Sequence, residues 1–100
     1  MKYKAEIIRN GRVQSVLYFG NLSHPNQVVR NVVQQMKGKM DYFIVFVVND
    51  VGEVWKYSVM KRPDNKLYVR KMEKGSVMLT RDDLDMIFTG NKSIYGGFVA

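Results

Sequence analysis

The sequence contains no cysteine and a single histidine. Without cysteine, the chain cannot form disulfides, has no thiol nucleophile and offers no thiolate to a zinc ion. One histidine also excludes metal sites that need several imidazoles. That histidine, His24, stands beside Pro25 at a predicted helix start, where a capping or surface role is far more common than catalysis. We therefore expect no metal site and no cofactor.

Long apolar runs are absent as well. The longest covers residues 42–48, whereas a membrane-spanning helix needs roughly 20 apolar residues. Lys2, Lys4 and Glu6 interrupt the first residues, so the chain does not begin with the apolar core of a signal peptide. Neither end carries a lipidation motif. We expect a cytoplasmic protein that does not bind membranes.

The nucleotide-binding and hydrolase motifs G-x-G-x-x-G, P-loop and G-x-S-x-G are also missing. The one acidic cluster, Asp82, Asp83 and Asp85, stands at a second predicted helix start, where carboxylates complement the helix dipole. Asp82 and Asp85 would share one helical face, so a divalent-ion site is an alternative interpretation. A histidine-free ribonuclease that uses lysine, arginine and tyrosine is another. We predict a non-enzymatic protein and assign no catalytic residue.

What the sequence does contain is enough apolar material for one small domain. It has 100 residues, of which 46% are hydrophobic, so it can build one core and not two. No repeat, linker or low-complexity segment divides it, and we predict a single basic α+β domain over residues 1–100. Lysine and arginine number 16 against 9 acidic residues, which gives a net charge of +7. Such a charge favours anionic partners.

Turn signals and hydrophobic periodicity predict the order β-β-α-β-β-β-α, a mostly antiparallel sheet with helices packed on it. Asn10-Gly11 indicates a two-residue hairpin turn, because both residues tolerate positive φ. The turn would join strands over residues 2–9 and 12–19. A regular ladder between these strands pairs Ala5 with Val16.

Ser23-His24-Pro25 predicts the start of the first helix, with the serine as the capping acceptor. Apolar residues then recur at helical spacing and form one face, and Gly38 ends the helix. This valine-rich face contains Val28, Val29, Val32, Val33 and Met36.

The second helix is predicted to begin at Thr80, with Asp83 as the partner in a capping box. Its apolar stripe is short, and it contains Leu84, Ile87 and Phe88. Residues 93–100 are predicted to form either a last edge strand or an ordered tail.

Three further strands complete the predicted sheet. Residues 42–48 show no polar alternation, which indicates a central strand covered on both faces. Residues 53–61 and 66–72 would form a hairpin around a turn that contains Pro63 and Asn65. The predicted register pairs Val59 with Val69, Met60 with Tyr68, and Ser58 with Arg70.

Alternation divides the apolar residues of these three strands between two faces. We predict that the valine-rich helix covers the face with Ile44, Phe46, Trp55, Tyr57, Val59, Leu67 and Val69. The other face would contain Phe43, Val45, Val47, Val54, Met60, Tyr68 and Met72. In one interpretation the second helix and the C-terminal segment cover this second face. In the other, part of it binds a partner or a second copy, so that the chain is a possible homodimer.

The most informative feature is a basic stretch from Lys56 to Lys74, whose only acidic residues are Asp64 and Glu73. Cations crowd both hairpin tips and tyrosines lie among them, as phosphate backbones and stacked bases require. The predicted nucleic-acid-binding residues are Arg9, Arg12, Lys56, Lys61, Arg62, Lys66, Tyr68, Arg70 and Lys71. A plainer interpretation is that long cationic side chains only keep edge strands from associating.

These observations favour two functions. In the first, an accessory protein binds RNA or DNA through its cationic hairpin tips and aromatic-bearing strand face. In the second, an inhibitor or adaptor of viral or mobile-element origin binds and blocks an acidic or nucleic-acid-handling partner protein. Charge serves both functions, because electrostatic steering follows the net field. Known modules do not fit: the chain lacks the glycines of an RNP1 box, and Arg81-Asp82-Asp83 replaces the lysine cluster of a double-stranded-RNA-binding domain.

Overall fold

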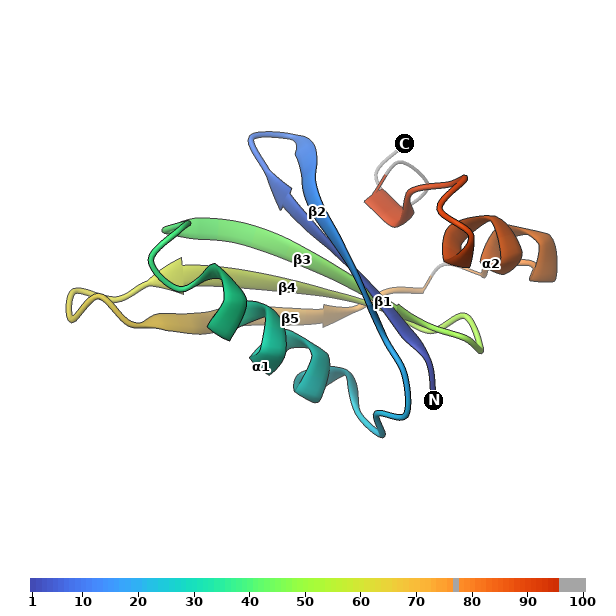
Figure 1. The fold of residues 1–100 in the computed structure, drawn as a ribbon, viewed down its shortest axis with the longest axis horizontal. Helices are drawn as coiled ribbons and strands as arrows, with labels where there is room; N and C mark the ends of the chain where they lie inside the picture. Colours follow the sequence, from blue (N-terminus) through green and yellow to red (C-terminus); the bar gives the residue numbers. More distant parts are fainter. Residues whose placement is uncertain (77, 96–100) are drawn as a thin grey trace.

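Five strands and two helices follow one another in the predicted order, in a computed structural model that describes residues 1–76 and 78–95. The strands form one antiparallel sheet in the order β2-β1-β3-β4-β5 (Figure 1). A radius of gyration of 13.0 Å is that of a single compact domain of this length. The elements are β1 (Tyr3–Arg9), β2 (Arg12–Phe19), α1 (Pro25–Met36), β3 (Tyr42–Asn49), β4 (Val54–Lys61), β5 (Leu67–Lys74) and α2 (Arg81–Phe88).

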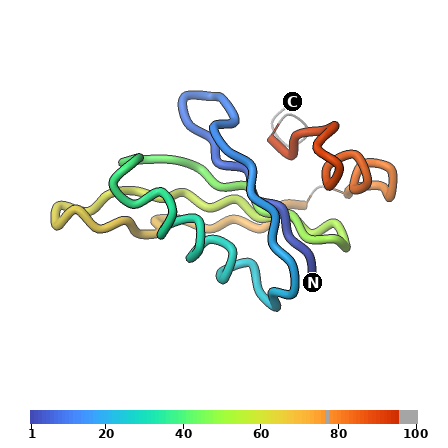
Figure 2. Tube along the Cα trace, viewed as in Figure 1, coloured from blue at the N-terminus to red at the C-terminus, as the bar shows by residue number. Residues whose placement is uncertain are grey.

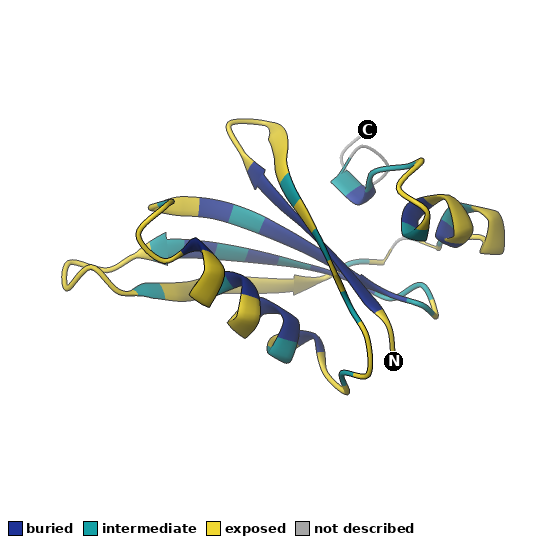
Figure 3. Cartoon of the chain, viewed as in Figure 1, coloured by how far each residue is buried: buried dark blue, intermediate teal, exposed yellow. Residues whose placement is uncertain are grey.

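The most buried strands lie in the middle of the sheet. In β1, residues 3–8 are all buried. In β3 both faces are covered from Val45 onward, as its unbroken apolar run predicts, but Tyr42 is exposed and Ile44 is only half-buried. The edge strands β2 and β5 are mostly exposed (Figure 3). Because the helices lie on opposite faces of the sheet, the domain contains two separate apolar clusters.

The first hairpin has the predicted turn, with φ of 53° at Asn10 and 72° at Gly11. Its predicted register holds only next to the turn. A β-bulge in the ladder shifts the remaining pairs by one residue, so Ala5 pairs with Leu17 and not with Val16. The shift has a physical reason, because it turns Leu17 toward the core beneath α1 and leaves Val16 half-exposed.

Helix α1 begins one residue later than predicted. His24, and not Ser23, is the N-cap, because its Nδ1 accepts a hydrogen bond from the Asn26 amide at 3.1 Å. The Gln27 side chain accepts in return from the His24 amide at 3.1 Å. The predicted apolar face is confirmed, since Val28, Val29, Val32 and Met36 are buried and Val33 is half-buried.

The first cluster packs beneath α1 and corrects the predicted face of β3. Phe43, Val45 and Val47 lie here with Trp55, Tyr57 and Val59, whereas Phe46 and Ile44 point to the other side. The pairing of Val45 with Tyr57 explains the difference, since directly paired residues share a face. The prediction had shifted β3 by one residue relative to β4, which reverses every side chain.

The second cluster packs between the opposite face and α2. Its buried residues are Ile8, Phe46, Val48, Val54, Leu84, Ile87 and Ile94. The predicted capping box is confirmed: the Thr80 hydroxyl accepts from the Asp83 amide and the Asp83 carboxylate accepts from the Thr80 amide, both at 3.1 Å. Residues 93–95 pack on the sheet and thus fit an ordered tail, while the rest of the predicted 93–100 segment lies outside the described residues.

A buried ion pair of β1 forms hydrogen bonds to α2 and to the segment that follows it. Lys4 and Glu6 are 2% and 1% exposed, and Lys4 Nζ lies 3.2 Å from Glu6 Oε2. The same ammonium donates to the Ile87 carbonyl near the end of α2 at 2.7 Å. Glu6 accepts from the backbone amides of Ile94 and Tyr95 and, at 2.6 Å, from a serine hydroxyl. Sequence analysis did not predict this cluster, which we call the clasp.

Candidate nucleic-acid interface

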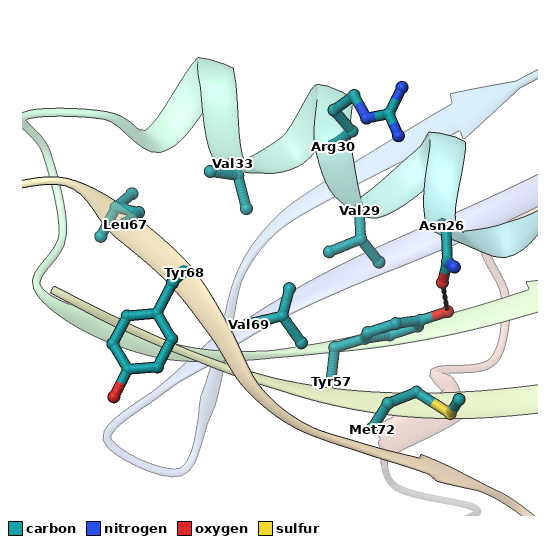
Figure 4. A pocket seen from close by; sticks show the side chains of 9 residues that line it. All are labelled: Asn26, Val29, Arg30, Val33, Tyr57, Leu67, Tyr68, Val69 and Met72. Carbon is teal, nitrogen blue, oxygen red and sulfur yellow. Dashed lines mark hydrogen bonds between the residues drawn. The ribbon is translucent and has the colours of Figure 1, made fainter. Parts of the chain in front are cut away.

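The β4–β5 hairpin carries different kinds of side chain on its two faces. Val69 pairs with Val59 and Tyr68 with Met60, as predicted, but Ser58 pairs with Lys71 and not with Arg70. Arg70 is therefore the extra residue of a β-bulge. This bulge places both cations of the pair Arg70–Lys71 on the face away from α1. Figure 4 shows Val69 pointing toward α1 and Tyr68 away from it.

Across the sheet, on the face opposite α1, three side chains form a row. Tyr42 of β3 pairs with Met60 of β4, which pairs with Tyr68 of β5. Because neighbouring strands are about 4.8 Å apart, the two tyrosines stand roughly 10 Å from one another. Their exposed fractions are 48% for Tyr42 and 38% for Tyr68, so both rings are accessible.

We call this region the open face, because α2 covers only the other part of the same side. Lys56, Ser58 and Met60 of β4 are half-buried there, as is Ile44 of β3. Arg70 reaches over the row, with its guanidinium 3.7 Å from the Met60 sulfur. The open face consists of Tyr42, Ile44, Lys56, Ser58, Met60, Tyr68, Arg70 and Lys71.

Three exposed ion pairs border the open face. Lys71 bonds Glu73 at 2.8 Å, and this hydrogen bond lowers the pKa of that carboxyl. At the hairpin tip, Lys61–Asp41 and Arg62–Asp64 are longer, at 3.5 and 3.7 Å. Exposed pairs of this kind contribute little to stability because solvent screens them, so a phosphate group can replace the carboxylate at little cost.

Two cations of the predicted set have no such carboxylate. Among residues 1–76 and 78–95, no acidic group lies within ion-pair distance of Lys66 or Arg70. Lys66 stands in the β4–β5 turn, where Asn65 adopts a left-handed conformation with φ of 68°. Lys66 and Arg70 can therefore bind an anion without first releasing a carboxylate. Lys56 differs, because it lies directly opposite Glu73 and its charge helps to lower the pKa of that carboxyl.

The structure brings only part of the predicted site together. Lys56, Tyr68, Arg70 and Lys71 share the open face, and Lys61, Arg62 and Lys66 lie at its end. Arg9 and Arg12 pair with one another at the tip of the other hairpin, and Arg9 lines a cavity together with Tyr42 and Ile44 of the open face. In Figure 2 the two tips point away from α2 in different directions.

Sequence reasoning missed two contributions. Tyr42 was treated only as the start of a buried strand, because its apolar run shows no alternation and only the pairing with Met60 reveals its place. Lys37 and Lys39 lie in the exposed turn between α1 and β3, at the same end of the sheet as the β4–β5 tip. They were not recognised because they are far from the basic stretch in sequence.

The acidic cluster at the start of α2 serves the helix. The Asp83 carboxylate bonds Lys92 at 2.8 Å and the Thr80 amide at 3.1 Å, and these bonds lower its pKa to about 2. No three histidine or acidic side chains converge within the described part of the chain. The described helices are also too short and too polar to cross a membrane.

Comparison with known proteins adds no relative. No family model, no curated protein and no solved structure matches this chain.

Proposed function

We propose that the domain binds single-stranded nucleic acid, RNA or DNA, on the open face. The observation that carries the proposal is the row Tyr42–Met60–Tyr68, two exposed rings on a rigid sheet with cations beside them. Unpaired bases stack on such rings, whereas bases inside a duplex are not accessible to a flat sheet.

Each part of the open face has a distinct task in this proposal. The rings of Tyr42 and Tyr68 provide stacking surfaces for two bases, with Met60 as the apolar floor between them. Arg70 neutralises a phosphate without losing an existing ion pair, Lys56 does so in competition with Glu73, and the hairpin-tip cations extend the path of the backbone. The net charge of +7 steers the strand to the domain.

A matched pair of tyrosine substitutions tests the proposal. Tyr68→Ala should weaken the binding of a labelled oligo(U) or oligo(dT) about tenfold or more, because stacking on one aromatic ring contributes about 1–3 kcal/mol. Tyr18→Ala is the control, since Tyr18 is 52% exposed but lies on β2, at the other edge of the sheet. Fluorescence anisotropy measures both affinities.

Salt dependence provides a second measurement. Arg70→Ala should reduce the slope of log affinity against log salt by about one, if Arg70 contacts one phosphate. A hairpin duplex of matched length should bind more weakly than the single strand at equal salt. Equal losses for Tyr68→Ala and Tyr18→Ala, or no binding at low salt, would contradict the proposal.

The predicted homodimer and the cytoplasmic location stay predictions. Sedimentation at high micromolar concentration distinguishes a monomer of 11.6 kDa from a dimer.

A further inference from the structure

The side of β5 that faces α1 contains a groove, which shares Tyr68 with the open face. α1 packs mainly on β1, β3 and β4, and a cavity of about 440 Å³ opens between the helix and the edge strand β5 (Figure 4). Its apolar and aromatic walls are Val29, Val33, Tyr57, Leu67, Tyr68, Val69 and Met72. Val69 is 42% and Met72 is 52% exposed, although both face α1. The prediction placed Met72 on the opposite face, but the β5 bulge pairs it with Tyr57.

The groove lies beside an open backbone edge. β5 is the last strand of the sheet, and no strand of the described structure pairs with its outer side. An extended peptide can add to such an edge, because the outward N–H and C=O groups provide a ladder and pockets select alternate side chains. Every second side chain of an added strand would point into the groove.

The charges of β5 indicate which kind of strand can add to its open edge. Lys66, Arg70, Lys71 and Lys74 lie on or beside this strand, with Glu73 as the one acidic residue of β5 itself. A second copy that paired edge to edge would place these cations against one another, which disfavours a dimer through β5. The remaining side chains of an added strand would lie next to Arg70 and Lys71, where carboxylates are favoured.

The rim of the groove also carries positive charge. Arg30 of α1 is the one charged side chain that lines the cavity among the described residues. Lys74 lies on the same side, with its ammonium 5.8 Å from the centre of the Trp55 ring, but an ion pair with Glu53 at 2.9 Å already neutralises it. We infer that β5 and the groove bind an extended segment of another protein, in which apolar and acidic residues alternate.

This inference does not depend on the proposed function. The two surfaces share Tyr68 and the cations Arg70 and Lys71, but the β5 bulge directs Val69 and Met72 into the groove alone. A groove variant can therefore be chosen that leaves every open-face side chain in place.

Synthetic peptides test the inference on the full chain. The probe is a short peptide of alternating leucine and glutamate, and the comparison peptide alternates leucine and lysine. We expect calorimetric binding of the glutamate peptide only, with slower amide hydrogen exchange along β5. Val69→Asp should weaken this binding about tenfold or more, since it places a carboxylate against the leucines of the peptide.

Val13→Asp is the matched control, because Val13 is also an edge-strand valine and is 38% exposed. It should leave peptide binding unchanged. If Val69→Asp fails to fold, Met72→Asp replaces it. Equal binding of both peptides, protection of amides outside β5, or equal losses for the β5 variant and Val13→Asp would overturn the inference. Loss of oligonucleotide binding in Tyr42→Ala, with peptide affinity retained, would show that peptide binding does not need the stacking surface, because Tyr42 does not line the groove.

Discussion

The two sides of the sheet are covered by helices in different ways. On one side, α1 presents a face of valines, and the cluster beneath it is built from apolar and aromatic side chains. On the other side, the short helix α2 contributes only Leu84 and Ile87 as buried residues, and the clasp of Lys4 and Glu6 fixes it. Burial of apolar area is not directional, whereas hydrogen bonds to a buried charge specify position.

The difference teaches how a short helix can be placed on a large sheet. Two turns of helix bury little area, so packing alone would permit several positions of α2. Lys4 contacts the end of α2 and Glu6 contacts the segment that follows, so one ion pair fixes both. We infer that the clasp fixes the position of α2 more than it adds to the free energy of unfolding. The reason is that a protein in which apolar residues replace a buried ion pair is often equally stable.

The largest effect is expected when the clasp loses one partner. Glu6→Ala leaves the Lys4 ammonium buried without its carboxylate and should cost about 3–5 kcal/mol in the free energy of unfolding. Urea unfolding measures this cost. The double variant Lys4→Met/Glu6→Leu should recover part of it, because no charge is then buried, although the Ile94 and Tyr95 amides still lose their acceptor. A loss below about 1 kcal/mol for Glu6→Ala would contradict the clasp as described.

A smaller cost is expected on the α1 side. Val32 is fully buried, so Val32→Ala should lower the free energy of unfolding by about 2 kcal/mol through lost apolar burial and a small cavity. The cost should not depend on salt or pH, because no charge contacts this position in the cluster. Denaturation at two salt concentrations checks both statements, and a marked salt dependence would refute the second.

The two sides should also differ in their response to acid. The folded state holds the Asp83 pKa at about 2, below its ordinary value of 3.8. The stabilisation is therefore complete above about pH 4 and is lost as the pH falls toward 2. Asp83→Asn should flatten the decline of the melting temperature over this range. Asp82→Asn, at the exposed neighbouring residue, is the control and should leave the decline in place.

At high pH the smallest effect should come from the α1 side. Burial raises the pKa of Tyr57 to about 12, and its hydroxyl donates to the Asn26 amide oxygen at 2.8 Å. The neutral phenol thus stabilises the fold fully below pH 10, and this contribution is lost as the pH rises through 12. Absorbance of the phenolate should show a late step that Tyr57→Phe removes. Ionisation of every tyrosine near pH 10 would disprove it.

Local patterns predicted single elements and turns better than contacts between distant segments. The valine spacing of α1, the Asn10-Gly11 turn and the Thr80 capping box depend on neighbours in the chain, and all three are confirmed. The clasp joins Glu6 to Ile94 and Tyr95, so no local window contains both partners. Both β-bulges also escaped prediction, because alternation alone does not show where a ladder gains a residue.

The same reasoning applies to the candidate site. Composition identified the cations of the basic stretch, since charge does not depend on register. It could not show that Arg70 and Lys71 share a face, because regular alternation would separate them. Tyr42 was missed for a related reason: its place beside Met60 and Tyr68 follows from the pairing of three strands.

Arg70 is the extra, unpaired residue of the β4–β5 ladder. Its position therefore determines where the chain can lose one residue and keep the sheet intact. Removing Arg70 would leave Val69 opposite Val59 and Lys71 opposite Ser58, so the ladder would close without reversing any neighbour. Elsewhere in these strands, the loss of one residue would exchange the two faces. A deletion of three nucleotides at this codon would therefore subtract one positive charge and leave the rest of the strand in place.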